Sequence, residues 1–183
     1  LTVFPTHRLV RGLPSFDSAK LLAACEKDFT LAGKASREES QAALEEAYQQ
    51  GKHAFALYDG AAWTLLTLKG PAVMDGLLPG MSQAYRELGV SILHNLVLER
   101  LLGIDKENMA NQKNLTYTRS AQEAEESVRA GESQCCFLLN PTRVEEIGQV
   151  AAFGEKMPQK STYFYPKLIT GLVMNDLEDP AGL

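Results

Sequence analysis

Residues 157–167, MPQKSTYFYPK, concentrate side chains that bind anions. Lysine ammonium groups attract phosphate as point charges, hydroxyl groups add hydrogen bonds, and aromatic rings stack on bases. Between residues 156 and 175 there are three lysines and no carboxylate, although the whole chain has a net charge of -5. The segment therefore predicts a site for a nucleotide or a phosphorylated metabolite. The candidate ligand-binding residues are Lys160, Ser161, Thr162, Tyr163, Tyr165 and Lys167.

The same segment has a structural interpretation. Its three aromatic rings could pack against a sheet and leave the lysines in solvent, in which case the tyrosines matter more than the lysines. Composition alone leaves both interpretations open.

A second positively charged segment is PTHRLVRG, residues 5–12. The guanidinium of Arg8 is a planar fork of donors that suits a carboxylate or a phosphate. Neighbouring residues on a strand point to opposite faces, so only one of His7 and Arg8 can face a pocket. Pro5 favours an edge or a bulge over the centre of a sheet. The alternative role of Arg8 is to keep a sheet edge soluble.

Other reactive residue types form no recognisable catalytic pattern. Cys135 and Cys136 are adjacent on a strand-like segment and point to opposite faces, so they cannot bind one metal together. His94 lies beside an apolar helical stripe and is interpreted as a packing residue. The sequence has no phosphate-binding loop, dinucleotide fingerprint or nucleophile elbow. We therefore expect no metal, no cofactor and no independent catalytic activity.

Composition restricts the class of protein. A chain of 183 residues with 45% hydrophobic and 22% charged residues can fold as one domain without disulfides. The negative net charge argues against nucleic acid and anionic membranes as partners, and no apolar run approaches the roughly 20 residues of a membrane span. Three cysteines without paired spacing indicate reduced thiols in a cytoplasmic protein.

Local patterns predict the elements that carry these residues. Two apolar runs flank Asp59-Gly60, which predicts a hairpin over 54–68. A strand, helix, strand, helix unit is expected over 115–153, a helix over 15–28 and a last strand over 168–176. The pattern favours an α+β fold with a mostly antiparallel sheet and helices packed on it. Three Ser/Thr-x-x-Glu pairs indicate helix starts: Ser36 with Glu39, Ser120 with Glu123, and Thr142 with Glu145.

Three stretches together resemble the C-terminal part of the domain-of-unknown-function family 1015 (DUF1015). They are LTVFPTHRLV, ILHNLVLERLLGI and CFLLNPTRVEEIGQVAAFGEKMPQKSTYFYPKLITGLV. The resemblance implies that residues 1–183 are a single C-terminal domain, a fragment of a longer bacterial or archaeal protein whose N-terminal region is absent. It also implies that residues 157–167 are a family signature.

Fuller members of that family look as if they carry an N-terminal Asp-Gly-His-His-Arg motif. This motif is similar to one in ParB-like and sulfiredoxin-like folds, some of whose relatives phosphorylate free serine. It does not occur in this sequence, so no catalytic role is carried over.

The leading hypothesis is a domain that completes a cleft for a small anionic ligand in a larger cytoplasmic protein, related to ParB-like small-molecule kinases. His7 and Arg8 would join the 157–167 segment at that cleft. The alternative is a structural module that stabilises the absent N-terminal region or forms a homodimer.

Overall fold

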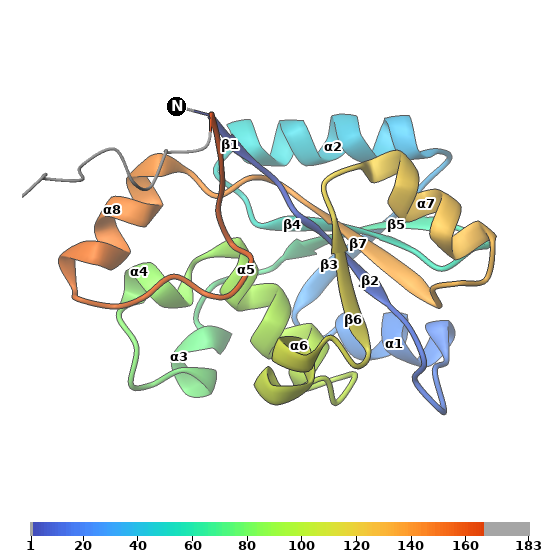
Figure 1. Cartoon of the computed structure of the whole chain (residues 1–183), viewed down its shortest axis with the longest axis horizontal. Helices are drawn as coiled ribbons and strands as arrows, with labels where there is room; N and C mark the ends of the chain where they lie inside the picture. The colour runs from blue at the N-terminus through green and yellow to red at the C-terminus, as the bar shows by residue number, and fades with distance from the viewer. Residues whose placement is uncertain (1, 167–183) are drawn as a thin grey trace, which may run out of the picture.

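The computed structural model describes residues 2–166 and shows a three-layer α+β fold (Figure 1). Its central layer is a six-stranded antiparallel sheet in the order β3-β5-β4-β7-β2-β6. The strands are β2 (His7–Val10), β3 (Phe29–Lys34), β4 (Ala54–Tyr58), β5 (Trp63–Leu68), β6 (Leu115–Thr118) and β7 (Cys135–Leu139). The predicted α+β class with helices packed on an antiparallel sheet is confirmed.

Helices cover both faces of this sheet (Figure 1). On one face lie α2 (Arg37–Gln49) and α7 (Ala121–Arg129). The other face carries a longer series of short helices, which includes a π-helix, η1. They are α1 (Ser18–Cys25), α3 (Val73–Leu77), α5 (Gly89–Ile92), η1 (Leu93–Glu99) and α6 (Lys106–Asn111). The remaining helices are α4 (Gln83–Arg86) and α8 (Val144–Ala152).

The sheet separates two hydrophobic cores because side chains alternate along each strand. Cys135 belongs to the core beneath η1, and Cys136 to the core beneath α2 and α7. Both cysteines are free and buried, and they point to opposite faces of the sheet, as the sequence predicted. On β2, Val10 lies in the η1-side core and Leu9 in the opposite core. Arg8 therefore shares the η1 side with Val10, and His7 shares the other side with Leu9.

The expectation that the N-terminal segment lies at a sheet edge is wrong for β2. That strand lies between β7 and β6 and pairs with both. Pro5 interrupts the pairing only locally: before it, β1 (Thr2–Phe4) pairs with β8 (Tyr163–Tyr165) in a separate two-stranded sheet. The proline thus marks the point where the chain passes from one sheet to the other, so it needs no place inside a ladder.

The structure agrees with the local predictions that depend on contacts between residues close in sequence. β4 and β5 form the expected 54–68 hairpin, and Asp59 accepts hydrogen bonds from the amides of Ala61 and Ala62, both at 2.9 Å. The unit at 115–153 is β6, α7, β7 and α8, with β2 inserted between its two strands. The helix expected over 15–28 is shorter, because Asp17 caps it and Glu26 ends it. The strand expected at 168–176 lies outside the described residues.

Two of the three predicted helix starts are confirmed. Ser36 accepts from the amide of Glu39, and Ser120 accepts from the amide of Glu123, each at 3.1 Å. Thr142 does not cap α8, because its hydroxyl donates to the carbonyl of Ser161 at 2.9 Å. A cap at Thr142 would start the helix at Arg143, but α8 begins one residue later, at Val144.

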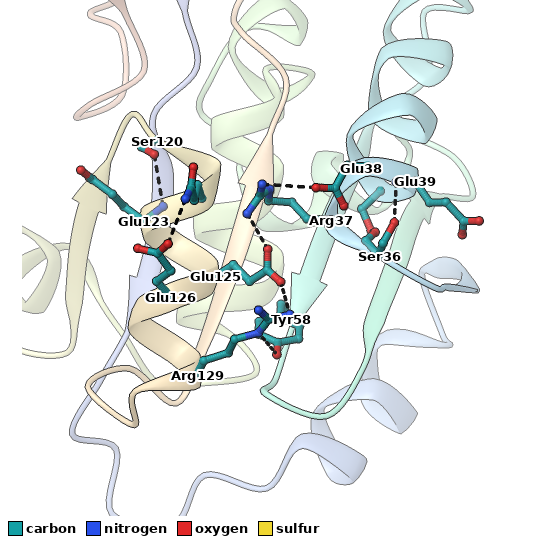
Figure 2. Close-up of polar contacts among 12 residues, drawn as sticks. Ser36, Arg37, Glu38, Glu39, Tyr58, Ser120, Glu123, Glu125, Glu126 and Arg129 are labelled. Carbon is teal, nitrogen blue, oxygen red and sulfur yellow. Dashed lines mark hydrogen bonds and ion pairs between the residues drawn. The ribbon is translucent and has the colours of Figure 1, made fainter.

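An ionic network joins the two helices on the α2 and α7 face (Figure 2). The carboxylate of Glu125, whose residue is only 5% exposed, accepts from Arg37 at 2.7 Å and from Arg129 at 2.6 Å. Arg129 also donates to the hydroxyl of Tyr58 on β4 at 3.3 Å. The buried carboxylate is therefore compensated from both sides, and the network fixes α7 against α2 and the sheet.

Glu125→Gln keeps the side-chain volume and removes the charge. We expect it to lower the free energy of unfolding by about 1–3 kcal/mol, since a buried charge-assisted hydrogen bond is lost. Urea unfolding followed by circular dichroism measures this change. Glu126→Gln on the exposed side of the same helix is the control. Equal stabilities of the two variants would contradict the role given to Glu125.

Candidate functional site

A cleft of about 400 Å³ lies between η1, α6 and the chain that precedes β8. This volume is within the range of sites for small molecules. From η1 it is lined by His94, Asn95 and Glu99, and from α6 by Lys106, Met109 and Ala110. The remaining lining residues are Tyr85 and the run Lys156, Met157, Pro158 and Gln159.

The cleft wall formed by η1 has unusual backbone geometry. The amides of Arg100 and Leu102 donate to the carbonyls of Asn95 and Val97, five residues earlier, at 3.3 and 3.1 Å. Such π-type turns are rare and occur frequently at functional sites. The sequence predicted an apolar helical stripe here, and the leucines within η1 are buried. The π-helix combines that buried side with a polar side, since His94, Asn95 and Glu99 line the cleft.

Arg8 lies directly behind this wall and is 1% exposed. Its Nε donates to Nε2 of His94 at 3.2 Å, and its Nη2 donates to the carbonyls of Lys160 at 3.0 Å and Gln159 at 3.5 Å. Nη1 donates to the carbonyl of Thr6. Its guanidinium carbon lies 5.2 Å from the ring centroid of Tyr117. Within residues 2–166, no carboxylate forms an ion pair with Arg8.

Burial governs the titration of this cluster. It lowers the pKa of Arg8 to about 10, and the guanidinium stays charged at neutral pH. Burial, together with the charge of Arg8, lowers the pKa of His7 to about 4 and that of His94 well below its usual value. Both imidazoles are therefore neutral. His7 uses its Nδ1 lone pair to accept the amide of Leu139 at 3.2 Å.

The predicted ligand-binding residues divide into separate environments. Ser161 is buried, and its hydroxyl donates to the carbonyl of Pro158 at 2.6 Å. Lys160 is exposed, with a left-handed backbone (φ 56°) and its ammonium 6.0 Å from the ring centroid of Tyr117. Thr162 is half-buried and leads into β8. Lys167 lies outside the described residues.

The tyrosines of the segment belong to β8. The ring of Tyr163 contacts the guanidinium of Arg119 at 4.1 Å, and Tyr165 lies 6.3 Å from Phe4 between ring centroids. None of the predicted residues within the described part of the chain lines the cleft. The cleft-lining part of the segment is the run 156–159, immediately before them.

Sequence reasoning missed His94, Lys106 and Lys156 as site residues. Lys156 carried a signal, because it begins the carboxylate-free stretch. Lys106 carried none, since an exposed lysine in a polar helix is ordinary. His94 was interpreted as a packing residue, and its burial agrees with that. Its contact with Arg8, 86 residues away in sequence, has no local signature.

A smaller hollow of about 70 Å³ lies beside Asn140, Thr142 and Arg143. Each of these side chains donates one hydrogen bond to a backbone carbonyl. Among the described residues no cluster of His, Cys, Asp and Glu could hold a metal ion. Nor does that part of the chain contain a helix long and apolar enough to span a membrane. Of these two hollows, the cleft of about 400 Å³ is the better candidate for a site of metabolite size.

Fold and cleft together define an α+β protein with helices on both faces of an antiparallel sheet and a polar cleft beside one helical layer. Residues 1–91 match the model of the family described as Protein of unknown function (DUF1015). The matched part includes Arg8 and stops before His94 and the 157–167 segment.

No curated protein matches the chain. Among solved structures, it is similar to a free serine kinase in complex with AMP, with a TM-score of 0.49 and 18% identity. That similarity covers 88% of this chain and 52% of the kinase. A mutant of such a kinase in complex with ADP has a TM-score of 0.47 and 16% identity, over 88% and 53% of the two chains. The chain thus spans about half the length of these structures.

The depressed pKa of His7 makes stability depend on pH. The unfolded chain binds a proton near pH 6.5 and the folded chain only near pH 4. Stability is therefore complete above pH 6.5 and falls as the pH drops from 6.5 to 4, by about 3 kcal/mol for this residue. His94 acts in the same direction. Urea unfolding at pH 7, 6, 5 and 4 measures the slope. His7→Asn, which retains an acceptor, should flatten it, and an unchanged slope would refute this assignment.

Proposed function

We propose that the cleft binds a small anionic ligand, a phosphorylated metabolite or a nucleotide, and that this domain completes a ligand site within a larger cytoplasmic protein. The observation that carries the proposal is the convergence of Lys106, from α6, and Lys156, from the chain before β8, on one cleft of metabolite size. Both lysines are exposed, so their ammonium groups are free to approach an incoming anion.

The electrostatics of the cleft favour an anion. Its lining contains two lysines and one carboxylate, Glu99. Behind the wall, the buried charge of Arg8 has neutral partners in the described part of the chain. A charge removed from water is poorly screened, so its field reaches the cleft more strongly than that of a solvated residue. Glu99 would accept from a hydroxyl or amino group of the same ligand.

The apolar part of the lining suits the remainder of such a ligand. Met109, Met157 and Pro158 provide apolar surface, and Tyr85 adds an aromatic ring. Pockets for cofactors and metabolites commonly combine an apolar lining with a few placed polar groups. A nucleotide, with its flat base and charged phosphate, has both chemistries.

The binding experiment is a thermal-shift screen followed by calorimetry on the 183-residue chain. Its probes are AMP, ADP, O-phosphoserine and inorganic phosphate. A ligand at a hundred times its dissociation constant should stabilise the protein by about 2.7 kcal/mol, which raises Tm by roughly 5–10 °C. Lys106→Ala and Lys156→Ala should each weaken binding about tenfold, the equivalent of about 1.4 kcal/mol.

Two further lysines serve as controls. Lys27→Ala removes an exposed lysine outside the cleft, and Lys160→Ala removes the neighbour of the cleft-lining run. Both variants should bind as the wild type does. If Lys160→Ala abolishes binding while Lys156→Ala does not, the anion binds the outer side of the 157–167 segment and the cleft is not the site. Absence of a shift with every probe refutes the proposal.

A structural or dimerisation role is the second candidate, and exposed apolar side chains favour it. Phe4 and Tyr165, on the β1–β8 sheet, are 43% and 62% exposed, and Phe153, after α8, is also exposed. Under this function Tyr165→Ala would change the molar mass measured by light scattering. An unchanged monomeric mass for the wild type would exclude the homodimer.

A further inference from the structure

His94 connects the buried charge of Arg8 to the cleft. The residue is 7% exposed and lines the cleft, and its Nε2 lies 3.2 Å from Nε of Arg8. A guanidinium has only donors and keeps its protons. Nε2 of His94 must therefore accept this hydrogen bond and carry no proton. Because the ring is neutral, its single proton is on Nδ1.

The Nδ1–H group of His94 makes no hydrogen bond to any residue of the described chain. Among residues 2–166, the fully buried side-chain atoms that lack a hydrogen-bond partner are Arg86 Nε, Ser91 Oγ and Tyr117 Oη, and Nδ1 of His94 is not one of them. This nitrogen is therefore not fully enclosed, and the residue that carries it lines the cleft. A nearly buried donor without an internal acceptor is costly unless a ligand or water satisfies it.

We propose that His94 donates its Nδ1–H to an anionic oxygen of the ligand, and that Arg8 is the positioning residue that fixes this tautomer. The inference rests on the proposed function and adds to it the group that recognises the anion. The oxygen can belong to a phosphoryl or a carboxylate group, because both accept this hydrogen bond. Hydrogen bonds to charged acceptors are shorter and stronger than neutral ones.

Arg8 gives this arrangement a second consequence. The same guanidinium that donates to His94 on the π-helix also donates to the carbonyls of Gln159 and Lys160. It therefore connects the π-helix to the chain that carries Lys156. One buried side chain thus sets the distance between the two walls of the cleft. A cation behind the imidazole also makes the Nδ1–H a stronger donor, since it withdraws electron density through Nε2.

The arrangement predicts which ligands are rejected. A neutral nucleoside offers no anionic oxygen to Nδ1–H, and a ligand that presents an ammonium group there would face a donor and a nearby cation. AMP should therefore bind at least tenfold more tightly than adenosine. Comparing the binding of citrate with that of inorganic phosphate distinguishes a carboxylate from a phosphoryl oxygen at Nδ1, because citrate carries only carboxylates.

The test combines nitrogen NMR of histidine-labelled protein with calorimetry. In the wild type, the His94 resonances, assigned by their loss in His94→Gln, should show a protonated Nδ1 and an unprotonated Nε2. Adding AMP should shift Nδ1. In His94→Asn the side-chain amide nitrogen occupies the position of Nδ1, whereas in His94→Gln it occupies the position of Nε2. His94→Gln should therefore weaken AMP binding by about 10- to 100-fold, and His94→Asn should weaken it less.

The possible failures are distinguishable. A proton on Nε2 in the wild type overturns the inference without any ligand. AMP binding that Lys156→Ala weakens and His94→Gln leaves unchanged overturns the inference and retains the proposed function. Absence of binding by AMP, phosphate and citrate overturns both. Arg8→Met should produce a mixture of tautomers, and if that variant does not fold, the wild-type spectrum still decides the tautomer.

Discussion

The burial of the Arg8 guanidinium is the constraint on which the rest of this structure depends. Removing a charge from water costs several kcal/mol unless its donors find acceptors. Here the acceptors come from three parts of the chain: Thr6 beside it, His94 on the π-helix, and the carbonyls of residues 159 and 160. The sheet, the η1 layer and the chain before β8 must therefore all be in place for this side chain to be tolerated.

Buried charges have different partners on the two faces of the sheet. On the α2 and α7 face, the carboxylate of Glu125 is paired with two arginines, so the ionic network is internally balanced. On the η1 face, Arg8 has neutral acceptors in the described part of the chain. The first arrangement holds helices together and offers no charge to a ligand. The second leaves positive potential next to the cleft, which is why the proposed site lies on that face.

The 157–167 segment contributes to packing and, in the proposed function, also to ligand binding. Its carbonyls at residues 159 and 160 serve as acceptors for Arg8, and Ser161 holds the turn through Pro158. Tyr163 and Tyr165 belong to a small sheet with β1. Within its described part, residues 157–166, only the first three residues line the cleft, together with Lys156 before them. Packing therefore explains most of the described segment, and the proposed ligand binding concerns only its beginning.

The sequence by itself determined the elements whose causes are local. The Asp59-Gly60 turn, the caps at Ser36 and Ser120, and the alternation that sends Cys135 and Cys136 to opposite cores all follow from neighbours a few residues apart. The tertiary structure decided that β2 lies inside the sheet, that Thr142 bonds Ser161 in place of capping α8, and that Arg8 meets His94. These outcomes depend on strand order and on contacts between distant segments. No local pattern encodes such contacts, because each partner's burial is set only when the whole sheet has formed.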